Sequence, residues 1–274
     1  MFFYKLLFNQ NGHYFDPQEE GKIICKKIER QSPVYEVNYE TFEGTNGSRE
    51  VNASFRPFNL TLTFDIFYKD EYDKILILTD LYNYIFPGYQ YYITHSLEPG
   101  KRYRVNPTDF KASDEANGYT QVEVSLTVPS GCSESLSSTL SDFSLDEEWQ
   151  FSQGLISEDY SYTSNSRNFI IYNGGDFLVD PRDQYLKITC EVSSDSNLTI
   201  LNKTTGDRFV YYPEIDIQLG QTLTLDGVYP KLNGVNCGID TNHGLITLAP
   251  GENQIEISNA NLAKTKWDFK FLYK

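Results

Sequence analysis

The sequence predicts a mainly β protein with two domains and one α-helix, and three observations carry this prediction. Aromatic residues make up 15% of the chain, including 21 Tyr and 18 Phe, and such side chains suit the half-buried surface of a sheet. Runs in which apolar and polar residues alternate recur along the chain, whereas a convincing helical spacing of apolar residues occurs in one stretch. The length of 274 residues fits two domains of ordinary size.

The N-terminal half is predicted to run in the order β-β-β-β-α-β-β-β. The strands are expected over residues 2–8, 22–29, 34–39, 56–68, 89–94, 101–106 and 120–128. The clearest is 56–68, in which every second residue from Phe58 to Tyr68 is apolar. Residues 2–8 are interpreted as a first strand and not as a signal peptide, because Lys5 interrupts the apolar run and no basic residue precedes it.

Residues 70–86 form the one convincing helix. Asp70 and Glu71 suit its N-terminus, where the helix dipole favours acidic side chains, and Pro87-Gly88 ends it. Apolar residues recur at steps of three and four, which predicts a stripe that covers one face or one end of a sheet. That stripe consists of Tyr72, Ile75, Leu76, Leu78, Leu81, Tyr82 and Ile85.

A polar segment with two glycines separates two alternating runs between residues 37 and 55. It is too long and too polar at its tip for an ordinary hairpin loop, so we expect a long hairpin or a projecting arm. Such an arm gains little within its own subunit, but its backbone can pair with the sheet of a neighbour. The candidate oligomerisation residues at its tip are Glu43, Gly44, Thr45, Asn46, Gly47, Ser48 and Arg49.

The composition changes after residue 128. Residues 129–149 are rich in serine, include the acidic run Asp146-Glu147-Glu148 and show little apolar periodicity, which is typical of a connection between domains. We therefore expect an N-terminal domain over residues 1–132, a linker over 133–149 and a C-terminal domain over 150–274.

Short strands joined by tight turns are predicted in the C-terminal domain. They are expected over residues 169–172, 184–192, 198–201, 208–212, 222–225, 245–248, 254–257 and 267–273. Asp226-Gly227 is a hairpin-turn dipeptide, and the strands that follow it up to Ile257 are expected to form a meander. Residues 267–273 are expected to form a strand that joins a sheet through its aromatic face, with Trp267 in the core.

The formal net charge of −15 argues against binding to a nucleic-acid backbone or to an anionic membrane surface, both of which reward clustered basic residues. The four cysteines are far apart in the sequence, which excludes a CxxC pair. Two long-range disulfides are possible, but free thiols are the expectation for a protein made in cytoplasm. No stretch reaches the roughly 18 apolar residues that a membrane span needs.

No catalytic, cofactor-binding or metal-binding residue is assigned, since no nucleophile elbow, phosphate-binding loop or dinucleotide fingerprint occurs. Asp240 to Gly244 has some character of a calcium loop, but its glycine stands one place early, so we expect these side chains to bond to their own turn. No sequence pattern links His13 and His95 in a common site. The chain has 38 acidic residues, so the sequence alone does not exclude two opposed carboxylates of the kind that glycosidases use.

The order of several turn motifs resembles that of the distal tail proteins of siphophages. The C-terminal run LDGVYP, DTNHGLITL and PGEN carries the closest likeness, followed by EPGKRYRV and the glycine-bearing arm in the N-terminal half. The resemblance implies an N-terminal split β-barrel like that of tail-tube proteins and a C-terminal galectin-like β-sandwich. It also implies a hexameric ring at the distal end of the phage tail, synthesised in the host cytoplasm, that contacts the tail tube protein, the tail-associated hub protein and receptor-binding proteins.

Two other functions compete with this structural role. A carbohydrate-binding adhesion protein that acts in host-surface attachment is the first alternative, and it rests on the sandwich fold alone. A glycan-degrading enzyme is the second. The family resemblance favours an adaptor that joins the tail tube to the tail tip, without enzymatic activity and without a cofactor.

Overall fold

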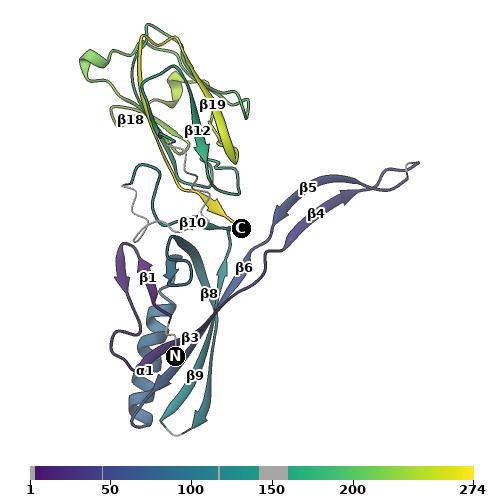
Figure 1. The fold of residues 1–274 in the computed structure, drawn as a ribbon, viewed down its shortest axis with the longest axis vertical. Helices are drawn as coiled ribbons and strands as arrows, with labels where there is room; N and C mark the ends of the chain where they lie inside the picture. The colour runs from purple at the N-terminus through teal and green to yellow at the C-terminus, as the bar shows by residue number, and fades with distance from the viewer. Residues whose placement is uncertain (1–3, 45, 117, 142–159) are drawn as a thin grey trace. The chain divides into compact units, whose positions relative to one another are not determined.

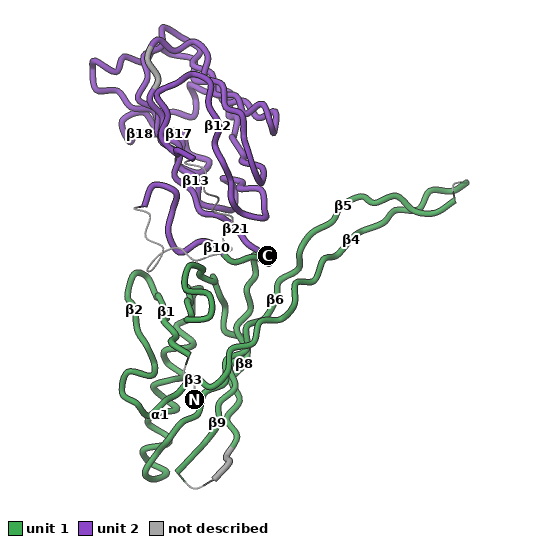
Figure 2. Tube along the Cα trace, in the orientation of Figure 1, with its two compact units in different colours: residues 1–133, 274 green, residues 134–273 purple. Residues whose placement is uncertain are grey.

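The computed structural model describes residues 4–44, 46–116, 118–141 and 160–274 (Figure 1). The chain divides into two units, one of residues 1–133 with Lys274 and the other of residues 134–273 (Figure 2). The prediction of a mainly β fold with one helix is confirmed. In the part of the chain that the structure describes, no helix combines the length and the apolar character needed to cross a bilayer.

The first unit is built on a sheet whose strands follow the order β2-β1-β7-β8-β9-β6-β3, all of them antiparallel. Their bounds are β1 (Leu6–Gln10), β2 (His13–Phe15), β3 (Ile23–Arg30), β6 (Phe58–Phe67), β7 (Tyr91–His95), β8 (Lys101–Ala116) and β9 (Tyr119–Val128). Within β6 the predicted alternation holds, since each of its apolar residues from Phe58 to Ile66 at every second position is buried.

Strand β8 is longer than predicted and connects two parts of this sheet. Its first residues pair with β7, and its later residues, from Asn106 on, pair with β9. The extension beyond residue 106 is missed by sequence reasoning because Pro107 interrupts the pattern. Proline is tolerated at irregular positions of a sheet, and the register of β8 against β9 shifts between Pro107 and Asp109.

Helix α1 (Glu71–Ile85) packs on this unit through a face that differs from the predicted stripe. Asp70 caps its N-terminus by accepting a hydrogen bond from the Asp73 N–H at 2.9 Å. The buried residues of the helix are Ile77, Leu81 and Ile85. Only the last two belong to the predicted stripe.

The described residues of the second unit form two sheets. The larger has the strand order β11-β20-β13-β16-β17-β18 and the smaller the order β12-β19-β14-β15. The strands of the larger sheet are β11 (Thr163–Ser164), β13 (Leu186–Ser193), β16 (Leu223–Asp226), β17 (Tyr229–Leu232), β18 (Val235–Asn236) and β20 (Leu262–Phe269). Those of the smaller sheet are β12 (Asn168–Asn173), β14 (Leu198–Asn202), β15 (Arg208–Tyr211) and β19 (Gly251–Ser258).

Apolar side chains from both sheets form the core of the second unit. Trp267 of β20 is fully buried, as expected, and its ring lies edge-on to Phe169 of β12 at 6.0 Å between centroids. Its indole N–H donates to Thr265 Oγ1 at 3.1 Å. The predicted hairpin at Asp226-Gly227 is confirmed, because Asp226 pairs with Tyr229 and Gly227 has a φ of 59°.

Two predictions for the second unit are wrong. Residues 245–248 form no strand. The Thr247 N–H donates to the Asp207 carboxylate instead of to a neighbouring strand, and Leu248 forms one isolated β-bridge with Val179. The predicted meander also ends early, at β18. The next strand, β19, pairs with β12 and β14 of the other sheet, a choice that depends on long-range partners and not on local alternation.

From Glu134 on, the described part of the predicted linker belongs to the second unit. Ser135 N–H donates to the Phe271 carbonyl at 2.8 Å, and β10 (Ser133–Ser135) pairs with β21 (Leu272–Tyr273). Thr139 donates through its hydroxyl to the Trp267 carbonyl at 2.7 Å. Hydroxyl side chains in this segment thus form hydrogen bonds with the backbone. A serine-rich composition therefore does not by itself indicate a linker without packed structure. The rest of the predicted linker, residues 142–149, and the predicted boundary at 150 lie outside the described residues.

Two short 3₁₀ helices lie in the loops of the second unit, η1 (Ile217–Leu219) and η2 (Gly238–Asp240). The four cysteines, Cys25, Cys132, Cys190 and Cys237, are free thiols, as expected. Burial raises the pKa of Cys25 and Cys190 to about 12 in each case, so both thiols are inert structural groups near neutral pH.

Candidate interaction surface

The predicted arm is a two-stranded ribbon that projects from the first unit (Figure 1). Strands β4 (Tyr35–Glu40) and β5 (Arg49–Phe55) are antiparallel, and Asn38 pairs with Asn52 through a side-chain bond of 3.1 Å. These strands pair only with each other among the described residues. An isolated two-stranded ribbon is marginally stable in water, so this arm is a segment that gains from a partner.

One face of the arm is apolar and the other is polar. The register places Tyr35 opposite Phe55 and Val37 opposite Ala53, with the Tyr35 and Phe55 rings 4.9 Å apart. Tyr39 follows on the same face of β4, since side chains alternate along a strand. A shift of the register between Asn38 and Tyr39 places Glu50 opposite Tyr39. Tyr35 is 56% exposed and Tyr39 63% exposed. The arm therefore presents an uncovered apolar stripe, whereas the polar and acidic side chains of β4 lie on the opposite face.

The tip of the arm is the site predicted from the sequence. Gly44 and Gly47 adopt φ values of 84° and 85°, a conformation that glycine accepts without strain. Glu43, Asn46, Ser48 and Arg49 are exposed, while Thr45 lies outside the described residues. The structure thus places the six described candidate residues together at the turn, and their role in assembly stays a prediction.

The base of the arm is fixed to the body of the first unit. Arg56 forms an ion pair with Glu36. Gly131 has a φ of 67°, and a Cβ placed there would lie 3.0 Å from the Arg56 carbonyl oxygen and 3.2 Å from that of Phe55. Because glycine allows this close approach, the backbone of the arm enters the body in a defined direction.

A second apolar surface lies on the outer side of helix α1. Tyr72 is 83% exposed, Ile75 59% and Leu76 64%. These residues were predicted to cover a sheet, and that prediction is wrong, as it is for the exposed Tyr82. The helix has apolar residues on two overlapping faces, so periodicity alone does not select the buried one. The face with Ile77 packs inward and the face with Leu76 remains uncovered.

A pocket of about 160 Å³ adjoins this surface, between α1 and the segment that connects β2 to β3. Its apolar part is formed by Phe15, Pro17, Ile23, Ile77, Leu81 and Tyr84. Its charged part is formed by Asp16, Glu19, Glu20, Lys22 and Asp80. Lys22 is already paired with Asp73 at 2.9 Å, a contact that raises the pKa of Lys22. The lining carboxylates have no ion-pair partner among the described residues, so the pocket is acidic.

A buried polar cluster holds the turn between β7 and β8. Glu98 accepts hydrogen bonds from Lys101 at 2.8 Å and from the Tyr103 hydroxyl. The His95 ring stacks on Tyr103 with centroids 5.5 Å apart. Burial lowers the pKa of His95, against the opposing effect of the nearby Glu98 carboxylate. This cluster is a structural support that is sensitive to acid.

Among the described residues, no group of three or more His, Cys, Asp or Glu side chains could hold a metal ion. The loop that resembled a calcium site uses its side chains internally, as expected. Asn242 accepts from the N–H groups of Val210 at 2.8 Å and Gly244 at 3.0 Å. A Cβ on Gly244 would lie 2.0 Å from the Arg208 carbonyl oxygen, so this loop is closed around its own backbone.

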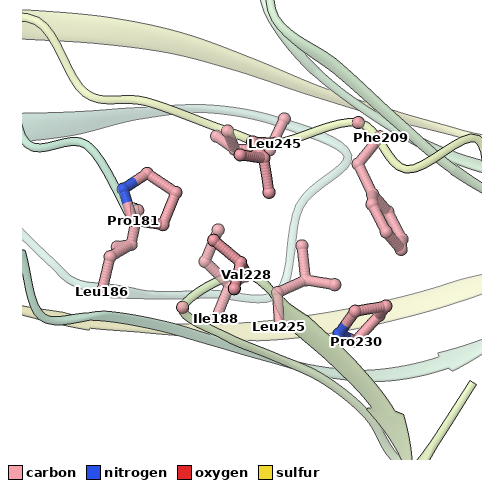
Figure 3. Close-up of a pocket in the computed structure, with 11 residues that line it drawn as sticks. Pro181, Leu186, Ile188, Phe209, Leu225, Val228, Pro230 and Leu245 are labelled. Atoms are coloured by element: carbon pink, nitrogen blue, oxygen red, sulfur yellow. The ribbon is translucent and has the colours of Figure 1, made fainter. Parts of the chain in front are cut away.

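The second unit contains a small apolar cavity of about 20 Å³ (Figure 3). Ile188 and Leu225 come from the larger sheet, Phe209 comes from the smaller, and Leu245 closes the space from a loop. This volume is that of roughly one water molecule. Sugar-binding sites use convergent polar groups and aromatic faces, so this cavity is a gap in core packing and does not favour a saccharide ligand.

Comparison with known proteins gives a match in sequence and a match in structure. The phage tail protein RIFT-related domain matches residues 11–128. The crystal structure of SPP1 Dit (gp 19.1) matches with a TM-score of 0.70 and 13% identity, over 98% of this chain and 99% of that chain. That protein is described as a paradigm of the hub adsorption apparatus in phages that infect Gram-positive bacteria. A chain of the phage P2 baseplate in its activated conformation with Ca matches with a TM-score of 0.45 and 12% identity, over 98% of this chain and 97% of that chain.

No curated protein sequence matches this chain. The chain is thus similar in sequence to the phage tail RIFT-related family over residues 11–128 and shares the fold of SPP1 Dit over almost its whole length. The resemblance to siphophage distal tail proteins that the motifs indicate is therefore confirmed.

Sequence reasoning located the arm but missed the exposed helix face and the acidic pocket. The arm leaves a local signal, which is a polar glycine-bearing tip between alternating runs. The pocket leaves none, because Glu19 and Glu20 are brought next to Asp80 only by the packing of α1. For the exposed helix face, the only signal in the sequence is that apolar residues occur on more than one face of the helix.

Proposed function

We propose that this protein is a structural adaptor in the distal tail or baseplate of a siphophage. Copies of the first unit form a ring, most simply a hexamer, that joins the tail tube to the tail-tip hub and to receptor-binding proteins. The observation that carries the proposal is the likeness of nearly the whole chain to SPP1 Dit, combined with a phage tail domain in the first unit. The role is structural and not catalytic, and the protein resides in the virion.

The arm supports assembly through head-to-tail contacts. Its strands have no partner besides each other among the described residues, and its apolar face is exposed. A head-to-tail contact that repeats around an axis closes a ring. Main-chain pairing or apolar contact with a neighbour would remove the exposed ribbon from water.

Light scattering of the full chain over a range of concentrations tests this function. The expected result is a discrete ring, alone or after addition of the hub protein of the same phage. Deleting residues 43–49 should weaken the ring while circular dichroism shows an unchanged fold. A protein that stays monomeric in both conditions would contradict the adaptor role. A ring that forms equally well without the tip would show that the arm is not the joint.

Antibodies raised against the protein provide an independent test of its location. They should label the distal end of the tail in virions viewed by electron microscopy. Labelling of the capsid or no labelling of intact particles would contradict the proposed place in the virion.

A further inference from the structure

We propose that Asn46, at the tip of the arm, is a site of spontaneous deamidation, and that the fold protects the other described Asn-Gly pairs from the same reaction. This inference does not depend on the proposed ring. Two features carry it: the Asn-Gly sequence of the tip, and the difference between this pair and the others in the hydrogen bonds that the described residues form with them.

The reaction joins the side chain of an asparagine to the backbone nitrogen that follows it. That nitrogen loses its proton and attacks the side-chain carbonyl carbon. A succinimide ring forms as the bond from this carbon to the side-chain amide nitrogen breaks, and the amide leaves with a proton as ammonia. Water then opens the ring at either carbonyl and gives aspartate or isoaspartate. A following glycine favours the attack, because it has no Cβ beside the nitrogen and its backbone is adaptable.

The sequence contains five Asn-Gly pairs, which begin at Asn11, Asn46, Asn117, Asn173 and Asn233. Local sequence favours the reaction at all five, and Asn117 lies outside the described residues. The structure discriminates among the other four. The asparagine side chain must rotate onto the next nitrogen, so hydrogen bonds that hold either group oppose the reaction.

The pairs at Asn173 and Asn233 are held through the asparagine side chain. Asn173 is 1% exposed, and its amide donates to the carbonyl oxygens of Phe177 at 2.9 Å and Leu248 at 3.1 Å. Asn233 is exposed, but its side-chain oxygen accepts a hydrogen bond from the Thr222 N–H at 2.8 Å. Both side chains must give up these bonds before they can react.

The pair at Asn11 is held through the attacking nitrogen. The Gly12 N–H donates to Asn9 Oδ1 at 3.0 Å. Gln10 pairs with His13, so the pair forms a two-residue hairpin turn, with φ values of 52° and 86°. Such a turn fixes the backbone of both central residues, and the reaction must open it first.

Asn46 and Gly47 lack contacts of this kind among the described residues. Both are exposed, and no hydrogen bond to the Asn46 side chain or to the Gly47 N–H occurs there. They lie beyond Glu40 and Arg49, the last paired residues of the arm. A Cβ placed on Gly47 would have no atom within 4 Å, so the space beside the attacking nitrogen is open. This pair therefore reacts without first breaking paired structure.

The product changes both the charge and the backbone of the tip. Each modified copy gains one carboxylate in the segment that already contains Glu43, Arg49 and Glu50. Isoaspartate also adds one carbon atom to the main chain. The arm of aged protein thus differs from that of fresh protein, whereas the buried core of the first unit is unchanged.

Peptide mass spectrometry of the full chain tests the site. The protein is incubated in mildly alkaline buffer, which promotes loss of the backbone proton, and is kept dilute so that light scattering shows separate subunits. Asn46 should be converted about tenfold faster or more than Asn11, Asn173 and Asn233, because those pairs must first give up hydrogen bonds. Ion-exchange chromatography should resolve a form with one more negative charge at the same rate.

The same incubation in concentrated urea separates the effect of the fold from that of the local sequence. A denatured chain retains only fluctuating structure, so the four asparagines should react at rates within about threefold of one another. If Asn46 stays intact in the folded chain, or reacts there no faster than Asn11 or Asn233, the proposal is wrong.

Gly47→Ala and Gly44→Ala are a matched pair of variants. The two glycines have φ values of 85° and 84°, and neither has an atom within 4 Å of a new Cβ. Both changes strain the tip alike, but only Gly47→Ala places a side chain beside the attacking nitrogen. Asn46 should react about tenfold more slowly in Gly47→Ala and at an unchanged rate in Gly44→Ala. Circular dichroism establishes that both are folded, and equal rates in the two variants would overturn the proposal.

Discussion

The arm and strand β6 of the first unit have similar sequence patterns but opposite environments. In β6, apolar residues at every second position are buried, with Leu62 and Phe64 fully inaccessible. In the arm, Tyr35, Val37 and Tyr39 also alternate with polar residues, yet the two tyrosines remain more than half exposed. Alternation therefore defines the faces of a strand, whereas burial requires a second layer, which the described residues do not provide for the arm.

This difference separates folding from assembly. Residues of β6 contribute to the stability of one subunit, whereas the proposed role of the arm is in contacts between subunits. Substitutions in β6, at the base of the arm and on its apolar face test that separation.

Leu62→Ala should give the largest loss of stability. Leu62 is fully buried in the core of the first unit. Removal of a buried leucine side chain typically costs about 2–5 kcal/mol in the free energy of unfolding, because transfer free energy is lost and a cavity remains. Urea unfolding monitored by circular dichroism measures the change. A loss below about 1 kcal/mol would mean that β6 is not part of a closely packed core.

Gly131→Ala should destabilise the junction between the arm and the body. The new Cβ would lie 3.0 Å from the Arg56 carbonyl oxygen in a backbone with a φ of 67°, and strain of this kind costs about 1–3 kcal/mol. Gly12→Ala is the control, because Gly12 has a φ of 86° but no atom within 4 Å of the new Cβ. Thermal unfolding should show a larger decrease for Gly131→Ala. Equal decreases would mean that the arm is not fixed at its base by this contact.

Acid should weaken the body of the first unit and not the arm. The pKa of His95 in the folded protein is lowered by burial, so its neutral form is favoured by folding. The contribution of neutral His95 to the free energy of unfolding is complete above the ordinary histidine pKa of 6.5. It is lost as the pH falls below that value, because the unfolded chain then takes up a proton. Unfolding measured between pH values of about 7 and about 5 should show this loss. His95→Gln should reduce it, and an unchanged slope in that variant would assign the effect to other groups.

Tyr39→Ser should have the smallest effect on the subunit. The Tyr39 side chain is 63% exposed on the arm, and substitutions at such positions usually change the free energy of unfolding by less than about 0.5 kcal/mol. The same change should weaken the ring, because it removes apolar area from the exposed face. Asn38→Ser alters the polar face and should leave assembly unchanged. If Tyr39→Ser unfolds the subunit, the arm is part of the core and the comparison with β6 fails.

The local features of this protein follow from its sequence. Asp70 marks the start of α1, and the Asp226-Gly227 turn forms where it was predicted, because both depend on residues close in the chain. The alternation over β6 and the glycine-bearing tip of the arm are likewise visible in the residues themselves. The order of turn motifs, which carries the resemblance to distal tail proteins, is likewise a property of the sequence alone.

Long-range packing decided the rest. The tertiary structure selected Ile77 rather than Leu76 as the inward side of α1, because helical spacing fits both faces. It placed β19 in the smaller sheet of the second unit, and it used Ser135 and Thr139 to bind the strand end near Phe271. It also gathered the carboxylates of the acidic pocket from separate parts of the chain. Spacing along a chain determines which side chains share a face, whereas the partner of that face depends on residues far away in sequence.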